Sequence, residues 1–527
     1  MSLIRSTSVI GGLTLLSRLF GFVRDMLLAR VLGAGLAADA YQLAFRLPNT
    51  FRRLFAEGAF SVAFVPMFAR KLVEEDGDAK AERFSEDVLS VFIWVLLVFS
   101  ALAIVAMPGI VWLLADDFAE VPGKFDLAVL LSRLTFPYLF FISIVSLLTG
   151  ILNSRSKFGP GAFAPVLFNL TLIGGIVSGW LMRGPGGDDR VVVLVLSVAV
   201  SLSGIAQLIY LWWRVRREGF RLQIRRPRFT PDVRELGWVI LPATFGAGIY
   251  QLSQLIDTYF ATSLPQGSLT LLAMGDRLNQ MPLGIVGIAL GTAILPMLSR
   301  HIMTEDREAA SRLQSNAVDL AMLLTLPAAA ALWVCASPFV FSFFVGGRFT
   351  AADGAVTADI VRALVAGLPA YVLIKIFQPA FFARKDTRTP VYVAATALTF
   401  NVALILLLIE PFGIVGLAAA TAGAAWLNAG LLYFLLHRRD HFRLQPWLIG
   451  RVLRQIVSTA IMAAALWWLA RWLGGWFTGS ILERAVAVAG LVAAGLAVYA
   501  VAGYATGALN RQRLAPLLRR GNRSGGK

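Results

Sequence analysis

The chain has 527 residues, of which 57% are hydrophobic and only 15% are charged, and its mean hydropathy is +0.72. This composition excludes a soluble protein, and apolar runs of about 18 or more residues recur from end to end, so it predicts an all-α polytopic membrane protein. The net charge of +17 does not indicate nucleic-acid binding, because the basic residues gather in short loops between apolar runs. The single cysteine, Cys335, excludes an intrachain disulfide.

Hydropathy predicts about fourteen membrane-spanning helices. We expect the first to be retained, because Arg18 interrupts its apolar run and no clear signal-peptide cleavage site follows. In chain order the predicted spans are 7–32, 40–68, 86–115, 127–152, 160–182, 190–213, 236–263, 268–299, 315–344, 356–383, 388–409, 412–436, 449–473 and 483–508.

Loop charge alternates along these spans. Gaps after odd-numbered helices are acidic or nearly neutral, as at Asp116–Asp126, whereas gaps after even-numbered helices are basic, as at Arg155–Lys157 and Arg300–Arg312. The positive-inside rule therefore supports an even number of helices and places both termini in the cytoplasm, including the basic tail 511–527.

Short segments recur about 230 residues apart, as in an internal repeat. The matched segments are PMFAR at Pro66–Arg70 with PMLSR at Pro296–Arg300, and SRSKFGP at Ser154–Pro160 with RKDTRTP at Arg384–Pro390. Each segment of the second pair precedes an apolar helix that contains an asparagine, Asn169 or Asn401. Because a unit of six helices keeps its orientation when repeated, we expect two lobes related by an axis along the membrane normal, as in alternating-access transporters.

Five parts follow from the repeat and the spans. They are an N-terminal lobe at 1–215, a cytoplasmic amphipathic linker at 216–235, a C-terminal lobe at 236–440, two further helices at 441–510 and the tail at 511–527. The linker places Phe220, Leu222 and Ile224 among arginines. This pattern fits either a segment lying on anionic headgroups or an ordinary connector.

Four arginines lie inside the first two predicted spans, namely Arg18, Arg24, Arg52 and Arg53. A guanidinium cannot be discharged in a protein, and one near the bilayer centre costs roughly 2.5–3.5 kcal/mol. Such residues therefore face the bundle interior or a water-filled cavity, and they mark substrate paths. A cationic cavity suits an anion with several acceptor oxygens, such as a phosphate or a diphosphate.

On the first helix, Ser17, Gly21 and Arg24 share one face. Asp25 can neutralise part of the arginine charge before an anion arrives. On the second helix, Glu57 is four residues after Arg53, a spacing that allows an ion pair.

Such a pair would leave Arg52 as the freer donor. The alternative is that these charges only pair with one another and lock the bundle. Because arginines outnumber carboxylates on both helices, the pattern favours a cavity.

The second lobe contributes further polar residues. Arg277 lies beside Asp276 and would either add positive charge from the opposite wall or extend to the headgroups at its helix end. Asp257 lies in the middle of the seventh span, where a carboxylate indicates a cation or proton site. Asn401 and Thr421 offer neutral oxygens that suit Na⁺, although each also fits a hydrogen bond between helices.

Three segments closely resemble the MurJ/MviN family of bacterial lipid II flippases, in the MOP exporter superfamily. They are Ser17–Arg70, Asp276–Arg300 and Ala383–Val391, and the likeness extends over essentially the whole chain. The resemblance implies a fourteen-helix inner-membrane protein with two six-helix lobes. Its substrate would be undecaprenyl-diphosphate-linked disaccharide-pentapeptide, moved from the cytoplasmic to the periplasmic leaflet, and its last two helices would form a groove for the polyprenyl tail.

The resemblance also implies roles for individual residues. By motif match the cavity arginines would be Arg18, Arg24, Arg52 and Arg277, with Asp25, Asp39, Glu57 and Gln251 as supporting polar positions. Some family members bind Na⁺ with an aspartate of helix seven and polar groups of helices eleven and twelve, a pattern that Asp257, Asn401 and Thr421 fit. Ile405 stands where a second carboxylate is expected, so such a site would carry one formal charge fewer.

The sequence therefore predicts a monomeric lipid II flippase that works by alternating access, with no cofactor other than Na⁺. Its expected partners are lipid II, membrane lipids and cell-wall synthesis proteins. Another polyprenyl-diphosphate-oligosaccharide exporter of the superfamily is the nearest alternative. A membrane enzyme acting on lipid diphosphates would need an in-membrane base or metal cluster, which the spans lack. A scaffold for cell-wall assembly would not need buried arginines.

The loop charges lead to a topological prediction. In a Cys335→Ala background, single cysteines in Asp116–Asp126 should react with an impermeant maleimide added outside the cell, and cysteines in Arg214–Arg234 should not, because basic loops stay in the cytoplasm. Labelling of Arg214–Arg234 from outside would overturn the predicted helix count.

Overall fold

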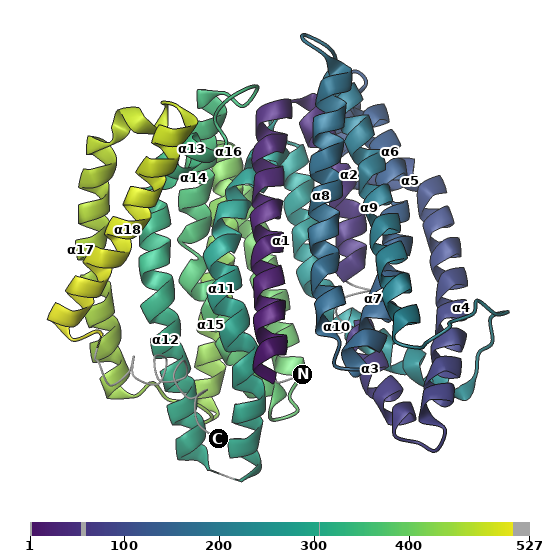
Figure 1. The fold of residues 1–527 in the computed structure, drawn as a ribbon. Coiled ribbons are helices and arrows are strands. Elements are labelled where there is room, and N and C mark those ends of the chain that lie inside the picture. The colour runs from purple at the N-terminus through teal and green to yellow at the C-terminus, as the bar shows by residue number, and fades with distance from the viewer. Residues whose placement is uncertain (1–2, 54–58, 305, 510–527) are drawn as a thin grey trace. The chain divides into compact units, whose positions relative to one another are not determined.

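The computed structural model describes residues 3–53, 59–304 and 306–509 (Figure 1). Over these ranges the chain forms α-helices and short 3-10 helices without a β-strand, so the predicted all-α polytopic fold is confirmed. Nine helical spans in the described ranges are long and apolar enough to cross a membrane. Glu57 and the tail 511–527 lie outside the described residues.

The chain divides into two compact units. The first comprises residues 1–270 and 346–349, and the second comprises 271–345 and 350–527. The lobes predicted at 1–215 and 236–440 stay a prediction. The helices of the first unit are α1 (Leu3–Leu32), α2 (Leu36–Arg52), α3 (Ala59–Leu72), α4 (Gly77–Val105), α5 (Met107–Leu114), η2 (Asp116–Glu120), α6 (Lys124–Thr135), α7 (Pro137–Ser154), α8 (Phe158–Arg183), α9 (Asp189–Arg217) and α10 (Pro231–Thr262).

Within the first unit, α8 packs against both α1 and α9, α2 packs against α6, and α3 packs against α4, α7 and α10. Phenylalanines at a spacing of four residues explain the position of α3. Phe60, Phe64 and Phe68 lie on one face of that helix and stack on one another. Phe84 and Phe92 of α4 stack on Phe64 and Phe60, which fixes α3 against α4.

The second unit is built on α12, which packs against α15 and α17, and α17 packs in turn against α18, as Figure 1 shows. Its core joins buried side chains of α11, α12, α15, α16 and α17. A polar contact adds to this packing, since Gln455 Nε2 of α17 donates to Asp319 Oδ1 of α12 at 2.8 Å. The bounds are α11 (Ser268–Met303, which begins in the first unit), α12 (Arg307–Val334), α13 (Ala336–Phe343), α14 (Ala351–Val365), α15 (Leu368–Phe382), α16 (Arg388–Arg438), α17 (Pro446–Trp472), η3 (Gly474–Phe477) and α18 (Ile481–Thr506).

Apart from 388–409 and 412–436, each predicted span corresponds to one helix or to two consecutive helices. The predicted spans 388–409 and 412–436 form the single element α16, in which Gly413 has the non-helical angles φ 53° and ψ −131°. The internal repeat is visible in the helix breaks, because Ala106 separates α4 from α5 and Cys335 separates α12 from α13, about 230 residues later.

The matched loops also share a backbone motif. Ser156 and Lys385 both have a left-handed φ near a helix end, 59° and 61°. The next residue in each loop donates its N–H five residues back, from Lys157 to the Leu152 carbonyl and from Asp386 to the Phe381 carbonyl. This is the Schellman arrangement, which satisfies the last carbonyls of a helix.

Asp386 also holds the start of α16. Its carboxylate accepts the N–H and hydroxyl of Thr389, and Arg439 Nη1 donates to it at 2.7 Å. Burial would raise the pKa of Asp386, but these hydrogen bonds and the charge of Arg439 outweigh it and lower the pKa to about 2. Asp386 therefore stays ionised near neutral pH and keeps the loop closed.

The linker between α9 and α10 is extended from Phe220 to Phe229 and runs along α4. Three of its N–H groups bond to side chains of α4. The pairs are Arg221 with Glu82 at 2.6 Å, Gln223 with Glu86 at 3.0 Å and Arg225 with Ser90 at 2.9 Å. Two residues of an extended chain and four residues of an α-helix both advance by roughly 6 Å. Every second linker residue can therefore meet every fourth residue of α4.

This register buries the intervening side chains of the linker. Phe220 and Leu222 are buried, and the Phe220 ring lies against Phe68 and the guanidinium of Arg155. Ile224 remains exposed. Two of the three apolar side chains that suggested contact with headgroups thus pack inside the protein, which favours the connector interpretation.

Candidate functional site

Arg24 lies in a buried polar network inside the first unit. Its Nε and Nη2 donate to Asp25 Oδ1 at 3.0 and 2.7 Å, and its Nη1 donates to Asn169 Oδ1 of α8 at 3.0 Å. The rings of Phe45 and Phe168 lie 5.8 and 5.7 Å from the guanidinium carbon. The predicted carboxylate partner is therefore confirmed, and the aromatic rings exclude water from around the charge.

The predicted face of α1 explains how Asn169 reaches Arg24. Asn169 Nδ2 donates to the Ser17 carbonyl at 2.9 Å, so one amide bridges Ser17 and Arg24. A Cβ at Gly21 would lie 3.4 Å from Asn169 Nδ2, at ordinary van der Waals contact, so this face of α1 lies directly against the bridge. In the sequence analysis, Asn169 was used only to support the internal repeat. A polar asparagine within an apolar span was the one feature that indicated a further role.

Arg18 differs from Arg24. It is half-buried on α1, and over the described residues no hydrogen bond or ion pair joins its guanidinium to another group. Arg18 and Arg24 are six residues apart, so they point from different faces of the helix. Of the two arginines on α1, Arg24 is thus held by neighbouring side chains, whereas Arg18 has no such partner among the described residues.

Arg52 and Arg53 are half-buried at the end of α2. Arg52 Nε donates to Asn49 Oδ1 at 3.1 Å, and Arg53 Nη1 donates to Gln254 Oε1 of α10 at 3.3 Å. Gln251, one turn earlier on α10, is buried. The first unit thus brings Arg53 next to the polar face of α10, whereas its predicted pairing with Glu57 stays a prediction.

Asp39 accepts four hydrogen bonds although it is almost fully buried. Its Oδ2 accepts from Lys124 Nζ at 3.3 Å and from the Gly267 N–H at 2.7 Å, and its Oδ1 accepts from the N–H and hydroxyl of Thr270 at 3.1 and 2.8 Å. Asp39 therefore caps the start of α11 from α2, where a negative charge also meets the positive end of the helix dipole. Lys124 was not predicted as a partner of Asp39, although it is the only basic residue of the acidic segment Asp116–Asp126.

The candidate cation ligands belong to different units. Asp257 is buried on α10 of the first unit, and Asn401 is buried on α16 of the second. Thr421, half-buried on α16, donates its hydroxyl to the Leu417 carbonyl at 3.1 Å, which leaves its oxygen lone pairs for a cation. In the described part of the chain, no three acidic, histidine or cysteine side chains are placed together so that they could hold a metal ion.

Arg277 is half-buried on the portion of α11 that belongs to the second unit. Ile405 is fully buried on α16, so an apolar side chain occupies the position expected for a second carboxylate. The oxygen types of Asp257, Asn401 and Thr421 suit Na⁺, but only one of them is charged.

Comparison with known proteins gives consistent matches over nearly the whole chain. A family model described as "Lipid II flippase MurJ" matches residues 28–487. The probable lipid II flippase MurJ of Rhizobium meliloti (strain 1021) is 41% identical over 525 residues, covering 99% of this chain and 97% of that protein. The lipid II flippase MurJ of Burkholderia cenocepacia is 34% identical over 476 residues, covering 88% of this chain and 90% of that protein.

Solved structures share the fold. A lipid II flippase MurJ in an inward closed conformation has a TM-score of 0.74 at 22% identity, covering 94% of this chain and 97% of that chain. A multidrug-resistance transporter of the MATE family and MOP superfamily, in an inward-facing conformation, has a TM-score of 0.67 at 14% identity, covering 82% of this chain and 97% of that chain.

The bridge formed by Asn169 can be tested by a double-mutant cycle. Asn169→Ala removes a buried acceptor from Arg24 and should lower the free energy of unfolding by about 1–2 kcal/mol. In an Arg24→Ala background the same change should have much less effect, because its partner is already gone. The measurement is thermal or denaturant unfolding in detergent micelles.

Thr171→Ala serves as the matched control, since the Thr171 hydroxyl of α8 bonds only to its own helix at the Leu167 carbonyl. This variant should show no dependence on Arg24. Equal losses for Asn169→Ala with and without Arg24 would show that the bridge is not formed.

Proposed function

The chain belongs to the MurJ family of lipid II flippases, and we propose that the intramembrane arginines of α1 and α2 bind the diphosphate of its substrate. The protein is a transporter rather than an enzyme. It moves lipid II, the undecaprenyl-diphosphate-linked peptidoglycan precursor, from the cytoplasmic to the periplasmic leaflet by alternating access. The barrier to this movement is the dehydration of a charged headgroup, and fixed guanidinium groups replace the lost water.

The observation that carries the proposal is Arg18. Its guanidinium is half-buried on α1, a predicted membrane span, and makes no ion pair with any described group. An arginine without a partner costs roughly 2.5–3.5 kcal/mol at the membrane centre, so an arrangement that serves only stability would pair or remove it. A diphosphate supplies the missing negative charge and several acceptor oxygens.

Arg24 has a second role in this proposal. Asp25 and Asn169 hold its guanidinium in one orientation before substrate arrives. Because Asp25 neutralises part of its charge, the first unit can fold around Arg24 in the absence of substrate. Arg24 thus adds attraction at a fixed position, whereas Arg18 provides a donor with greater freedom, and Arg52 and Arg53 add positive charge at the end of α2.

Asp39 would close one end of the transport path. Its four hydrogen bonds join α2 and Lys124 to the start of α11. A buried carboxylate that loses these donors must regain water or other donors, so the closed arrangement opens only when water enters. Such an all-or-none contact suits a gate in an alternating-access cycle.

The polyprenyl tail would remain in contact with lipid along α17 and α18. Both helices expose large apolar side chains, including Leu453, Val457 and Ile461 on α17 and Leu496 on α18. The loop charges support an orientation with both termini in the cytoplasm.

The cavity arginines provide the direct test. We expect Arg18→Ala to weaken lipid II binding by about 10–100-fold, because each charge-assisted hydrogen bond contributes about 1.5–3 kcal/mol. Arg24→Ala and Arg52→Ala should also abolish complementation of a flippase-depleted strain, at normal membrane levels of the protein. Arg18→Lys should restore activity only partly, because an ammonium lacks the two-pronged geometry of a guanidinium.

The matched control is Arg190→Ala. Arg190 is an exposed arginine at the start of α9 whose ion pair with Asp188 is long, at 3.9 Å. Its loss should leave complementation unchanged. Full activity of the three cavity variants would contradict the assignment of the diphosphate to these arginines.

Asp257 provides the test of the driving force. With one carboxylate and neutral partners, a Na⁺ site should be weak, so we expect Asp257→Asn to reduce transport only partly. Membrane potential would be the main drive, since moving one charge across 100 mV is worth roughly 2.3 kcal/mol. The measurement is flipping in proteoliposomes with potential and Na⁺ gradient set independently. If transport depended strictly on Na⁺ and this dependence disappeared in Asp257→Asn, the Na⁺ gradient rather than the membrane potential would be the main driving force.

A further inference from the structure

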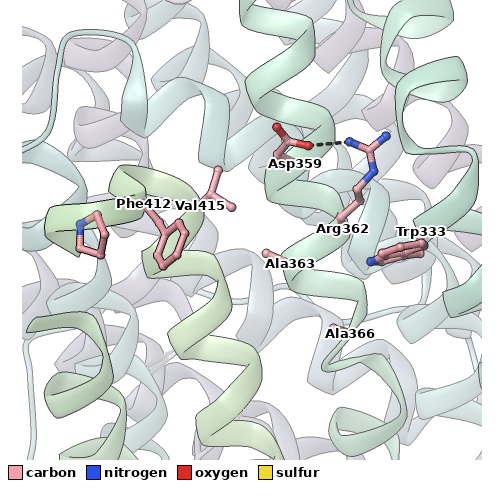
Figure 2. Close-up of a pocket in the computed structure, with 8 residues that line it drawn as sticks. Trp333, Asp359, Arg362, Ala363, Ala366, Phe412 and Val415 are labelled. Carbon is pink, nitrogen blue, oxygen red and sulfur yellow. Dashed lines mark hydrogen bonds and ion pairs between the residues drawn. The ribbon is translucent and has the colours of Figure 1, made fainter. Parts of the chain in front are cut away.

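A shallow, largely open groove lies in the second unit, on elements other than those of the candidate site in the first unit. Its volume is about 600 Å³, which is within the range of small-molecule sites. Figure 2 shows Asp359, Arg362, Ala363 and Ala366 along one helix, α14 and the residue after it. Trp333 of α12 lies on one side of this helix, and Phe412 and Val415 of α16 lie on the other. Pro411 of α16 also lines the groove.

The helix lengths around the groove fit a position where the membrane meets water. Arg388–Glu410, the first part of α16, is about 34 Å long at 1.5 Å per residue, enough to cross the hydrocarbon layer. The chain then turns at Gly413, whose non-helical backbone could not be left in lipid without hydrogen-bond partners. Pro411 and Phe412 belong to this turn, and an exposed tryptophan such as Trp333 is typical of the interface.

The polar groups of the groove form a neutral pair that remains accessible. Arg362 Nη1 donates to Asp359 Oδ1 at 2.5 Å, and Arg362 Nη2 donates to the Ser337 hydroxyl at 2.8 Å. The side chains of Asp359 and Arg362 are 55% and 32% exposed, so each can also bind a ligand. Ser337 fixes the guanidinium, while Trp333 and Phe412, both more than half exposed, offer apolar surface beside it.

From this arrangement we propose that the groove binds the headgroup of a zwitterionic phospholipid that carries a primary ammonium, as in phosphatidylethanolamine. The phosphate would bind Arg362 and the ammonium would bind Asp359, so each charge of the ligand meets its opposite. The glycerol and the upper part of the chains would lie on Trp333 and Phe412. An anionic lipid such as phosphatidylglycerol would leave Asp359 without a cation and close to negative charge, so it fits less well.

The experiment is native mass spectrometry of the full chain in detergent, titrated with phosphatidylethanolamine or phosphatidylglycerol. We expect the first bound phosphatidylethanolamine to be held about tenfold more tightly than phosphatidylglycerol, as expected for one charge-assisted bond. Arg362→Ala should weaken both lipids about tenfold. Asp359→Asn should weaken only phosphatidylethanolamine and so remove the preference.

Two further variants make the result decisive. Arg312→Ala removes another exposed arginine with an in-helix partner, Glu308, and should change nothing. Ala363→Leu keeps both charges but fills the groove, so it should weaken both lipids even if a charge variant folds poorly. Equal binding of the two lipids, or equal effects of Arg362→Ala and Arg312→Ala, would mean ordinary annular lipid and overturn the proposal. Binding is measured without transport, so failure here leaves the flippase assignment untouched.

Discussion

The energy of a guanidinium inside a membrane governs the arrangement of α1 and α8. Because an arginine cannot give up its proton, each one in a span needs a negative or polar partner. That partner is either another side chain of the protein or a bound ligand. Arg24 has both a negative and a polar partner, Asp25 beside it and Asn169 across from it. Arg18 has none in the described residues, which is why the binding function is assigned to it first. Two arginines on the same helix thus differ in their surroundings, since one is held by a carboxylate and an amide and the other has neither.

Polar contacts also decide how loops join the helices. Asp39 binds backbone and side-chain donors at the start of α11, and the linker bonds its N–H groups to Glu82, Glu86 and Ser90 of α4. In both cases a side chain satisfies N–H groups that no regular helix or sheet would satisfy. These contacts are strong when complete and unfavourable when half-made, so they favour discrete arrangements over gradual ones.

The two units repeat one pattern of breaks. Helices end at Ala106 and Cys335, and the loops at Ser156 and Lys385 close with the same left-handed residue and the same hydrogen bond. The residue types at these positions differ, so the repeated backbone is better preserved than the repeated sequence.

Hydropathy was sufficient to predict the helices, because burial in lipid restricts which residues a span can hold, whereas the cationic site stays a prediction. The face formed by Ser17, Gly21 and Arg24 was predictable for the same reason, since helical periodicity is local. The partners Asn169, Lys124 and Thr270 were not, because each is far along the chain from the residue it binds and only packing brings them together. Likewise, the alternation of Phe220 and Leu222 was visible in the sequence, but whether lipid or protein covers them depends on the position of α4. Local patterns thus determined where the chain crosses the membrane and where charge enters it, whereas tertiary packing decided which charges are neutralised and which stay available to a ligand.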